Sequence, residues 1–362
     1  MKYPVYQPSL VGNEKKYVNE CLDSTWISSK GKFVQQFETT FAQFIGVSHS
    51  ASVCNGTVAL HLALEALGIG EGDEVIVPTL TYIASVNAIT YTGAKAVFVD
   101  SLEDTWQIDH KDVEQKITKD TKAIMCVHVY GHACDMDQLT AICKERDLFL
   151  IEDCAEAIGT LYKGQHVGSF GDVATFSFYG NKTITTGEGG MVVTNHRTLH
   201  DRMVHLKGQG LAKYREYWHD AVGYNYRMTN ICAAIGCAQM EQIDHILQKK
   251  KEIASWYQDA FKSTAIAFHQ EAPETNHSYW MCTVLLPEDV DREKLKAALI
   301  DKGIETAIHY PIPPHKQPAY SEWGDLEYPI TEQIHEEVMS LPMSPAHTVE
   351  DAQYVASMIN AY

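Results

Sequence analysis

The chain has 362 residues and a net charge of -18 at pH 7, from 47 acidic and 29 basic residues. Hydrophobic residues at 45% and charged residues at 21% describe a globular protein with room for one large domain and a smaller one. The acidic balance argues against a nucleic-acid partner or an anionic membrane surface, and no apolar run reaches the roughly 18 residues of a membrane span.

The N-terminus and the cysteines predict the compartment. Residues 1–4 begin no apolar stretch of the signal-peptide kind. The nine cysteines are scattered along the chain and form no CxxC motif, which argues against a disulfide framework. We therefore expect a cytoplasmic protein with free thiols.

Strand-like and helix-like runs alternate through the first part of the chain. This order predicts an α/β fold with a mainly parallel sheet that helices cover on both faces. Apolar runs predict strands at Ser50–Val53, Glu74–Pro78, Lys95–Asp100, Lys122–His128, Leu148–Asp153, Val173–Phe178 and Gly190–Thr194. Helix-length stretches lie between most of these runs, at Thr57–Leu67, Ile83–Thr92 and Met136–Asp147.

The pattern changes after about Gln242. A long helical stretch comes first, followed by two expected strands and two expected helices. These elements are Met240–Phe261, strands near Tyr279–Leu286 and Thr306–Tyr310, and helices near Arg292–Lys302 and Val349–Asn360. We expect residues 1–241 to form the large domain and residues 242–362 a smaller α+β domain.

The first stretch that suits ligand binding follows the strand ending at Val53. Here the chain turns through Asn55 and Gly56 into an apolar helix that begins near Thr57. The free N–H groups and the positive dipole end of a helix start favour an anion such as phosphate. Many helices begin this way without a ligand, so this pattern alone leaves both interpretations open.

Two further residues follow the ends of predicted strands. Tyr82 comes just after Pro78 and is either a core residue or a flat platform for a ligand. Asp153 ends a buried strand, where ligands bind in open α/β sheets, although an aspartate there can also cap the next helix.

Four potential metal ligands fall within nine residues: Cys126, His128, His132 and Cys134. The first two lie on a predicted buried strand, and no second pair follows at the spacing of a zinc finger. We therefore expect no metal site.

Lys182 lies on a glycine-rich loop between the runs Val173–Phe178 and Met191–Thr194. The loop is too short for a crossover helix, so the two strands should be antiparallel if they pair. The nearby glycines let another group approach the backbone closely. A lysine in a turn is usually just solvated, and only its surroundings argue otherwise.

Three groups of residues around this loop resemble the cofactor-lysine motif of sugar aminotransferases that use pyridoxal phosphate (PLP): Ser177, Asn181–Thr183 and Thr186–Gly190. The resemblance is to the DegT/DnrJ/EryC1/StrS family of the aspartate-aminotransferase fold group, and within it to the perosamine-synthase type. It extends from about Pro8 to the C-terminus. It implies PLP fold type I, with a three-layer α/β/α large domain around a mixed seven-stranded sheet and a smaller α+β domain.

The resemblance implies a role for each motif residue. Lys182 would bind PLP covalently and act as the general base when freed, because burial lowers the pKa of a lysine. Asp153 would keep the pyridine nitrogen protonated, which makes the ring an electron sink. The other cofactor-binding residues it implies are Gly56, Thr57 and Ser177 at the phosphate, Tyr82 stacked on the ring, and Glu156 at the ring's oxygen side.

The resemblance also implies substrate contacts. Residues 26–31 resemble a substrate loop, with Trp26, Ser28 and Lys30 as candidates. Residues 224–229 match a segment that relatives reach across a homodimer, so that Asn225 would meet the partner's PLP phosphate in a shared active site. The remaining candidates are Arg227 for a substrate phosphate, and His309, Tyr310 and His315, although both histidines are equally suited to an ordinary loop role.

The resemblance implies transfer of an amino group from L-glutamate to a nucleotide-linked 4-keto-6-deoxysugar with a GDP or dTDP carrier. The product would be a 4-amino-4,6-dideoxysugar for surface polysaccharide (O-antigen) synthesis. Residues 308–315 depart from the perosamine-synthase version, which leaves a 3-keto-sugar aminotransferase as a rival. A catalytically silent PLP-fold regulator is a second rival. A dehydratase relative carries histidine at the position of Lys182, so this lysine argues against that activity.

Overall fold

A seven-stranded sheet forms the centre of the computed structural model, which describes residues 1–362. The strand order is β1-β9-β8-β5-β4-β2-β3. Strand β9 is antiparallel to both of its neighbours, β1 and β8. All the other neighbouring strands are parallel to each other. The strands are β1 (His49–Val53), β2 (Glu74–Pro78), β3 (Lys95–Val99), β4 (Thr121–Val127), β5 (Phe149–Asp153), β8 (Val173–Ser177) and β9 (Gly190–Thr194). This confirms the predicted mixed seven-stranded sheet.

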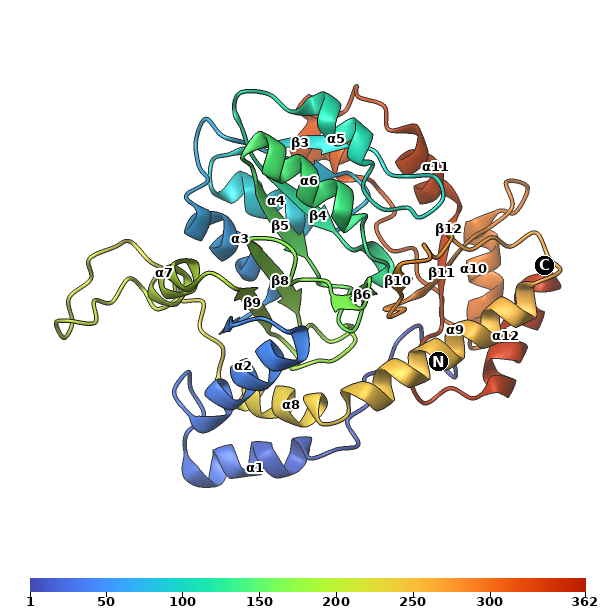
Figure 1. Cartoon of the computed structure of the whole chain (residues 1–362). Coiled ribbons are helices and arrows are strands. Elements are labelled where there is room, and N and C mark those ends of the chain that lie inside the picture. The colour runs from blue at the N-terminus through green and yellow to red at the C-terminus, as the bar shows by residue number, and fades with distance from the viewer.

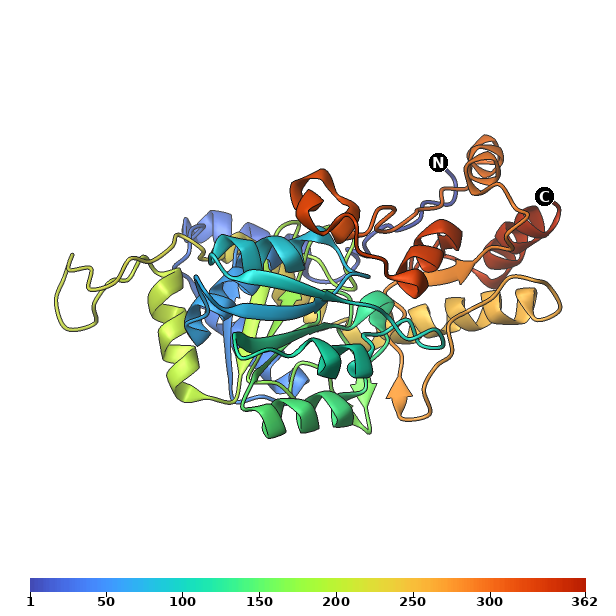
Figure 2. The ribbon, with the colours of Figure 1, turned by 90° about the horizontal axis from the view of Figure 1, so that it is seen from above.

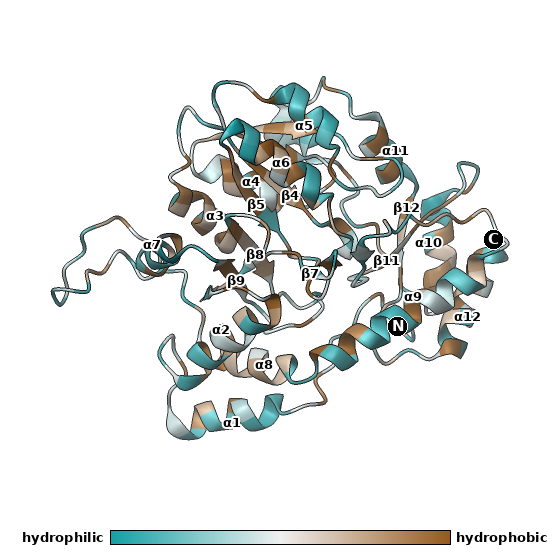
Figure 3. Cartoon of the chain, in the orientation of Figure 1, coloured by the Kyte–Doolittle hydropathy of each residue, from teal (hydrophilic) through white to brown (hydrophobic).

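Helices cover both faces of this sheet (Figures 1 and 2). Neighbouring strand residues point to opposite faces, so Ile76 lies in one core while Val75 and Val77 lie in another. The first face carries α2 (Lys32–Ile45), α5 (His110–Lys116), α6 (Met136–Arg146) and α8 (Asn230–Met240); the second carries α3 (Gly56–Leu67), α4 (Ile83–Tyr91) and α7 (Arg197–Lys207). Strands buried on both sides explain the continuous apolar runs, which appear brown in Figure 3.

The C-terminal part has a core of its own. Its two-stranded antiparallel sheet joins β11 (Cys282–Leu285) and β12 (Val338–Leu341). Both termini lie in this part (Figure 1). Near the N-terminus, Tyr3 forms a parallel bridge with Ile304. Its helices are α9 (Ile243–Phe261), α10 (Arg292–Asp301), α11 (Pro329–Glu337) and α12 (Val349–Asn360).

The remaining elements are short or peripheral. Helix α1 (Glu14–Ser24) packs against α8. A small sheet joins β6 (Leu161–Tyr162), β7 (Gln165–His166) and β10 (Thr275–Asn276), and 3-10 turns occupy Val129–Gly131, Pro314–Lys316 and Pro318–Trp323. No helix is both long enough and apolar enough to cross a membrane.

Two expected elements differ from the structure. The helical stretch Met240–Phe261 is divided, because α8 ends at Met240 and α9 begins at Ile243. The strand expected at Thr306–Tyr310 is only one bridge, between Ala307 and Ser340. Tyr310 has a φ of 59°, which no extended strand allows. The domain boundary between residues 241 and 242 stays a prediction.

Candidate active site

A cavity of about 720 Å³ opens at the carboxyl ends of the parallel strands. Strands β5 and β8 contribute Asp153 and Ser177 to its lining, and the first turn of α3 contributes Gly56. The loop between β8 and β9 brings in Lys182, and the C-terminal part closes the cavity with His309 and Tyr310. The site therefore forms where ligands bind in open α/β sheets.

Asp153 is buried at the end of β5. Its Oδ2 accepts a hydrogen bond from the Ser85 hydroxyl at 2.8 Å, and its Oδ1 accepts one from the amide of Ala155 at 3.0 Å. Burial raises the pKa of this carboxyl, while the two donors and the nearby cation of Lys182 oppose the rise. A buried carboxylate of this kind gains from a further cationic partner.

The Lys182 side chain is only 12% exposed, and its Nζ lies 3.9 Å from Oε1 of Glu156. Burial lowers the pKa of the amine, and the carboxylates of Glu156 and Asp153 oppose that effect. The backbone around it is fixed, because the Tyr6 hydroxyl donates to the carbonyl of Lys182 at 2.7 Å. The lysine is thus neither solvated nor locked in a close ion pair.

Glu156 is held by two donors. Its Oε2 accepts a hydrogen bond from the amide of Tyr130 at 2.6 Å, and its Oε1 accepts one from the Tyr310 hydroxyl. Burial raises the pKa of this carboxyl, and Lys182 opposes the rise. Tyr130 and Tyr310 have φ values of 59°, a left-handed conformation that is costly for a tyrosine and often found at functional sites.

The start of α3 forms an anion cradle. The Asn55 side chain caps the helix by accepting from the amide of Val58 at 3.0 Å. The amides of Gly56 and Thr57 have no acceptor in the preceding turn and line the cavity. A Cβ at Gly56 would lie 2.8 Å from the Cβ of Ser177, so only glycine allows this close approach.

Tyr82 lies at the N-terminal end of α4, where its side chain is 57% exposed and lines the cavity. Its ring centroid is 5.7 Å from that of Tyr310. An exposed aromatic face at the mouth of a cavity suits a flat ligand better than a core role.

The sequence pattern of the DegT/DnrJ/EryC1/StrS aminotransferase family matches residues 8–360. The chain belongs to this family. It is 59% identical to the GDP-perosamine synthase of Escherichia coli O157:H7 over 100% of this chain and 99% of that one. It is also 48% identical to the GDP-perosamine synthase of Vibrio cholerae, over 99% and 98% of the two chains. The PLP form of the putative sugar aminotransferase Spr1654 from Streptococcus pneumoniae superposes with a TM-score of 0.94 at 28% identity, over 100% and 98% of the two chains.

The aminotransferase site fits the family's cofactor, PLP. Two buried polar atoms at this site, Oδ1 of Asn181 and Oγ1 of Thr175, have no partner within the chain, although both residues line the cavity. Unsatisfied polar atoms of this kind are rare unless a ligand or water engages them. The chain is a PLP-dependent aminotransferase, and the donors, the carboxylate and the amine described above match the groups of PLP.

The structure brings most of the predicted cofactor residues of this aminotransferase to one cavity. Those that line it are Gly56, Thr57, Tyr82, Asp153, Glu156, Ser177 and Lys182, together with the candidate substrate residues His309 and Tyr310. Trp26, Ser28, Lys30, Asn225 and Arg227 lie outside this lining. Asn225 accepts a hydrogen bond from Arg227 at 3.0 Å.

His315, the remaining candidate, is fully buried away from the cavity. Its Nδ1 lies 2.6 Å from the Thr79 hydroxyl and its Nε2 lies 3.1 Å from Oε1 of Glu332. Both ring nitrogens are therefore engaged within the chain, which is the pattern of a structural histidine.

Several residues at the site carry no sequence signal. The sequence predicts no role for Trp280 or Tyr6, yet Trp280 lines the cavity and the Tyr6 hydroxyl donates to the carbonyl of Lys182. Tyr91 and Tyr179 also line it. No motif or spacing marks Tyr6, Tyr91 or Trp280, because they come from distant parts of the chain that meet only in the fold. Tyr179, by contrast, stands three residues before Lys182 in the lysine loop itself.

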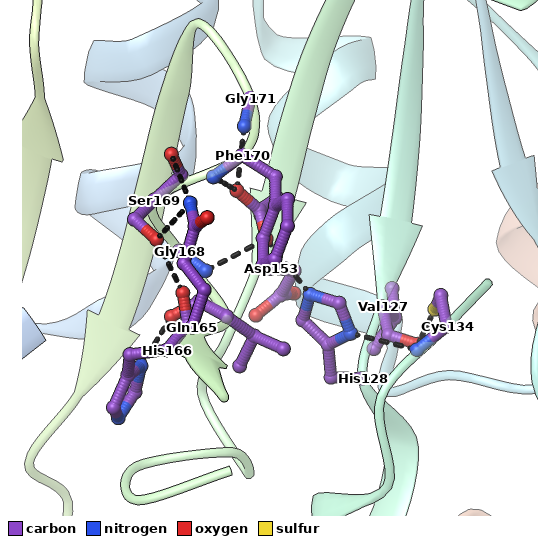
Figure 4. A network of polar contacts seen from close by, with 12 residues as sticks. Val127, His128, Cys134, Asp153, Gln165, His166, Gly168, Ser169, Phe170 and Gly171 are labelled. Carbon is purple, nitrogen blue, oxygen red and sulfur yellow. Dashed lines mark hydrogen bonds and ion pairs between the residues drawn. The ribbon is translucent and has the colours of Figure 1, made fainter. Parts of the chain in front are cut away.

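The strand that carries Asp153 is anchored by a buried polar network (Figure 4). Glu152 accepts hydrogen bonds from the amides of Gly168, Phe170 and Gly171, and it lies 3.1 Å from Nε2 of His128. The Nδ1 of His128 accepts from the amide of Cys134, so Nε2 carries the proton. His128, Glu152 and Cys154 are close enough to share a metal ion, but these bonds already use the histidine nitrogens and the carboxylate.

Proposed function

We propose that this aminotransferase moves an amino group from L-glutamate to C4 of a nucleotide-linked 4-keto-6-deoxysugar. The observation that carries the proposal is the amine of Lys182, buried in a cavity between Asp153, Glu156 and the anion cradle of α3. The similarity to two GDP-perosamine synthases supports a GDP carrier over dTDP, and a 4-amino-4,6-dideoxysugar product for O-antigen synthesis.

The cavity residues divide the work. When bound, PLP supplies a ring that withdraws electrons from the carbon that loses its proton. Lys182 would hold the cofactor and, once its amine is free, would move a proton at its Nζ between the substrate carbon and the cofactor carbon. Asp153 keeps the ring nitrogen protonated. The amides of Gly56 and Thr57, with the Ser177 hydroxyl, bind the phosphate, and Tyr82 restrains the ring.

We also propose a homodimer with shared active sites. Asn225 and Arg227 lie outside their own chain's cavity, which is consistent with a role at the partner's phosphate groups. The segment that leads to them, residues 208–223, projects from α7 (Figure 1). Its Tyr217 and Val222 are 91% and 92% exposed, and a contact with a second chain would bury these side chains.

We propose a cytoplasmic location for this enzyme. All nine cysteines are free, which suits a reducing compartment.

The test is a substrate screen. Purified enzyme with L-glutamate is offered GDP- and dTDP-linked 4-keto and 3-keto deoxysugars, and the products are followed by mass spectrometry. We expect conversion of the GDP-linked 4-keto sugar with formation of 2-oxoglutarate. Preferred conversion of a 3-keto sugar would support the rival aminotransferase, and no conversion of any keto sugar by PLP-loaded enzyme would support a silent regulator.

A further inference from the structure

The free amine of Lys182 lies over the indole ring of Trp280. The Nζ of Lys182 lies 4.0 Å from the centroid of the indole ring, and Trp280 is only 1% exposed. The indole Nε1 donates a hydrogen bond to the carbonyl of Asn181 at 2.8 Å. Trp280 therefore contacts both the amine of the cofactor lysine and the peptide just before it.

The backbone of Trp280 is itself held by a buried lysine. The buried amine of Lys250, on α9, donates to the carbonyl of Trp280 at 2.9 Å and lies 4.8 Å from the ring centroid of Tyr6. Tyr6 in turn donates to the carbonyl of Lys182. Two successive carbonyls of the lysine loop are thus bound by aromatic side chains that share Lys250 as support.

Four titratable groups surround the amine. Asp153 and Glu156 favour its charged form, but Glu156 at 3.9 Å is too distant for a hydrogen bond. His309 is neutral near pH 7, because burial and the nearby Lys182 lower its pKa to about 4. The Tyr310 hydroxyl is engaged by Glu156. No hydrogen-bonded anion therefore stabilises the ammonium form, and the indole centroid at 4.0 Å is about as close to Nζ as Oε1 of Glu156 at 3.9 Å.

A desolvated ammonium group is attracted to the negative face of an aromatic ring, and tryptophan is the strongest of these rings. We infer that Trp280 is a positioning residue that holds the unbound amine of Lys182 against its indole face and stabilises the proton taken up at Nζ. This inference rests on the proposed function, because it concerns the lysine that moves the proton. It assigns a role in the reaction to a residue that no motif identifies.

The test measures the pKa of Lys182 in the full chain freed of PLP. Trace labelling with acetic anhydride at a series of pH values, followed by peptide mass spectrometry, reports the neutral fraction of that one amine. The variants are Trp280→Met, which fills the space without a ring, and Trp280→Phe, which keeps a weaker ring. Trp256→Met is the matched control, because Trp256 lies 5.4 Å from Lys249 outside the cavity.

We expect Trp280→Met to lower the pKa of Lys182 by about one unit, a roughly tenfold gain in neutral amine below the pKa. Trp280→Phe should lower it by less, and Trp256→Met should not change it. An unchanged or raised pKa in the methionine variant would overturn the inference. If near-UV circular dichroism shows that this variant does not fold, the phenylalanine variant decides by the same criterion. The labelling needs neither PLP nor turnover, so it can fail while the proposed function stands.

Discussion

Two buried carboxyl groups flank the amine of Lys182, and their partners separate their tasks. Asp153 accepts hydrogen bonds from one hydroxyl and one amide, and because it is buried its carboxylate is stabilised by a nearby cation. Glu156 is bound by the Tyr130 amide and the Tyr310 hydroxyl, close to the lysine. We infer that Asp153 keeps the nitrogen of the cofactor ring protonated and that Glu156 adjusts the pKa of Lys182.

Replacing Asp153 tests the first task. Asp153→Asn keeps the shape but removes the negative charge, so the ring nitrogen loses its stabilising partner. We expect turnover to fall by at least about a hundredfold, roughly 2.7 kcal/mol of transition-state stabilisation, while part of the bound PLP remains. The measurement is kcat together with the visible absorbance of bound PLP. Ser85→Ala, which removes one donor and keeps the charge, should have a smaller effect. Turnover near that of the wild type in Asp153→Asn would make this aspartate a structural residue.

The pH dependence tests the second task. The carboxylate of Glu156 raises the pKa of Lys182 against the effect of burial, so Glu156→Gln should lower that pKa further. If the reaction requires the neutral amine of Lys182, kcat rises with pH through the pKa of that amine. This rising part of the pH profile should therefore move to lower pH in the variant. The measurement is the pH profile of kcat. A rising part that stays in place, or moves to higher pH, contradicts this role.

The start of α3 shows why the site needs particular backbone contacts. The amides of Gly56 and Thr57 reach a ligand only because β8 passes close by, with the Cβ of Ser177 2.8 Å from the position of a Cβ on Gly56. Because Gly56 has no Cβ, the first turn of α3 can pack closely against β8, the strand that precedes the lysine loop.

Adding that Cβ should damage cofactor binding. Gly56→Ala must push Ser177 or the helix start away, which misplaces the phosphate donors. We expect the Kd for PLP to rise about tenfold or more, equal to roughly 1.4 kcal/mol, as measured by fluorescence titration of the PLP-free enzyme. Gly70→Ala is the control, because its Cβ would lie 3.6 Å from its nearest neighbour, the carbonyl of Thr92. Equal affinity in the Gly56 variant and its control would refute the cradle.

Much of the large sheet could be predicted from the sequence, because strands buried on both faces appear as apolar runs. Strands β2 and β9 occupy the predicted ranges, and α12 does as well. The C-terminal part was predicted less well. Strand β12 was missed because its four residues give too short a pattern, and Tyr310 interrupts an otherwise strand-like run with a left-handed conformation.

The site residues likewise fall into those that the sequence predicts and those that it does not. Lys182, Asp153 and Gly56 stand in local motifs, so their neighbours along the chain point to them. Trp280 and Tyr6 act on the same lysine from positions 98 residues after it and 176 residues before it, as the hydrogen bonds and the cation–π contact show. Contacts of that range follow from the packing of the two parts, which no local pattern contains.

The proposed shared active site makes a prediction about mixed dimers. If Asn225 binds the partner's phosphate, Lys182→Ala and Asn225→Ala damage complementary halves of each site. One site of a mixed dimer then carries both changes and the other carries neither. Random pairing makes about half of the dimers mixed, so about a quarter of all sites should be intact.

Co-expression of the two variants, each with its own affinity tag, allows the mixed dimer to be purified and assayed. We expect each variant alone to be impaired and the mixed dimer to recover about half the wild-type activity, one intact site in two. A mixed dimer no more active than the better single variant would show that each site is built from one chain.

Borohydride reduction tests directly whether Lys182 is the residue that binds PLP. The holoenzyme is treated with borohydride, which reduces a lysine–PLP linkage to a stable secondary amine, and its peptides are then mapped by mass spectrometry. We expect the visible absorption band to disappear and the pyridoxyl group to be found on Lys182, with no label in Lys182→Ala. A label on any other lysine, or an unchanged band after reduction, would show that Lys182 does not bind PLP.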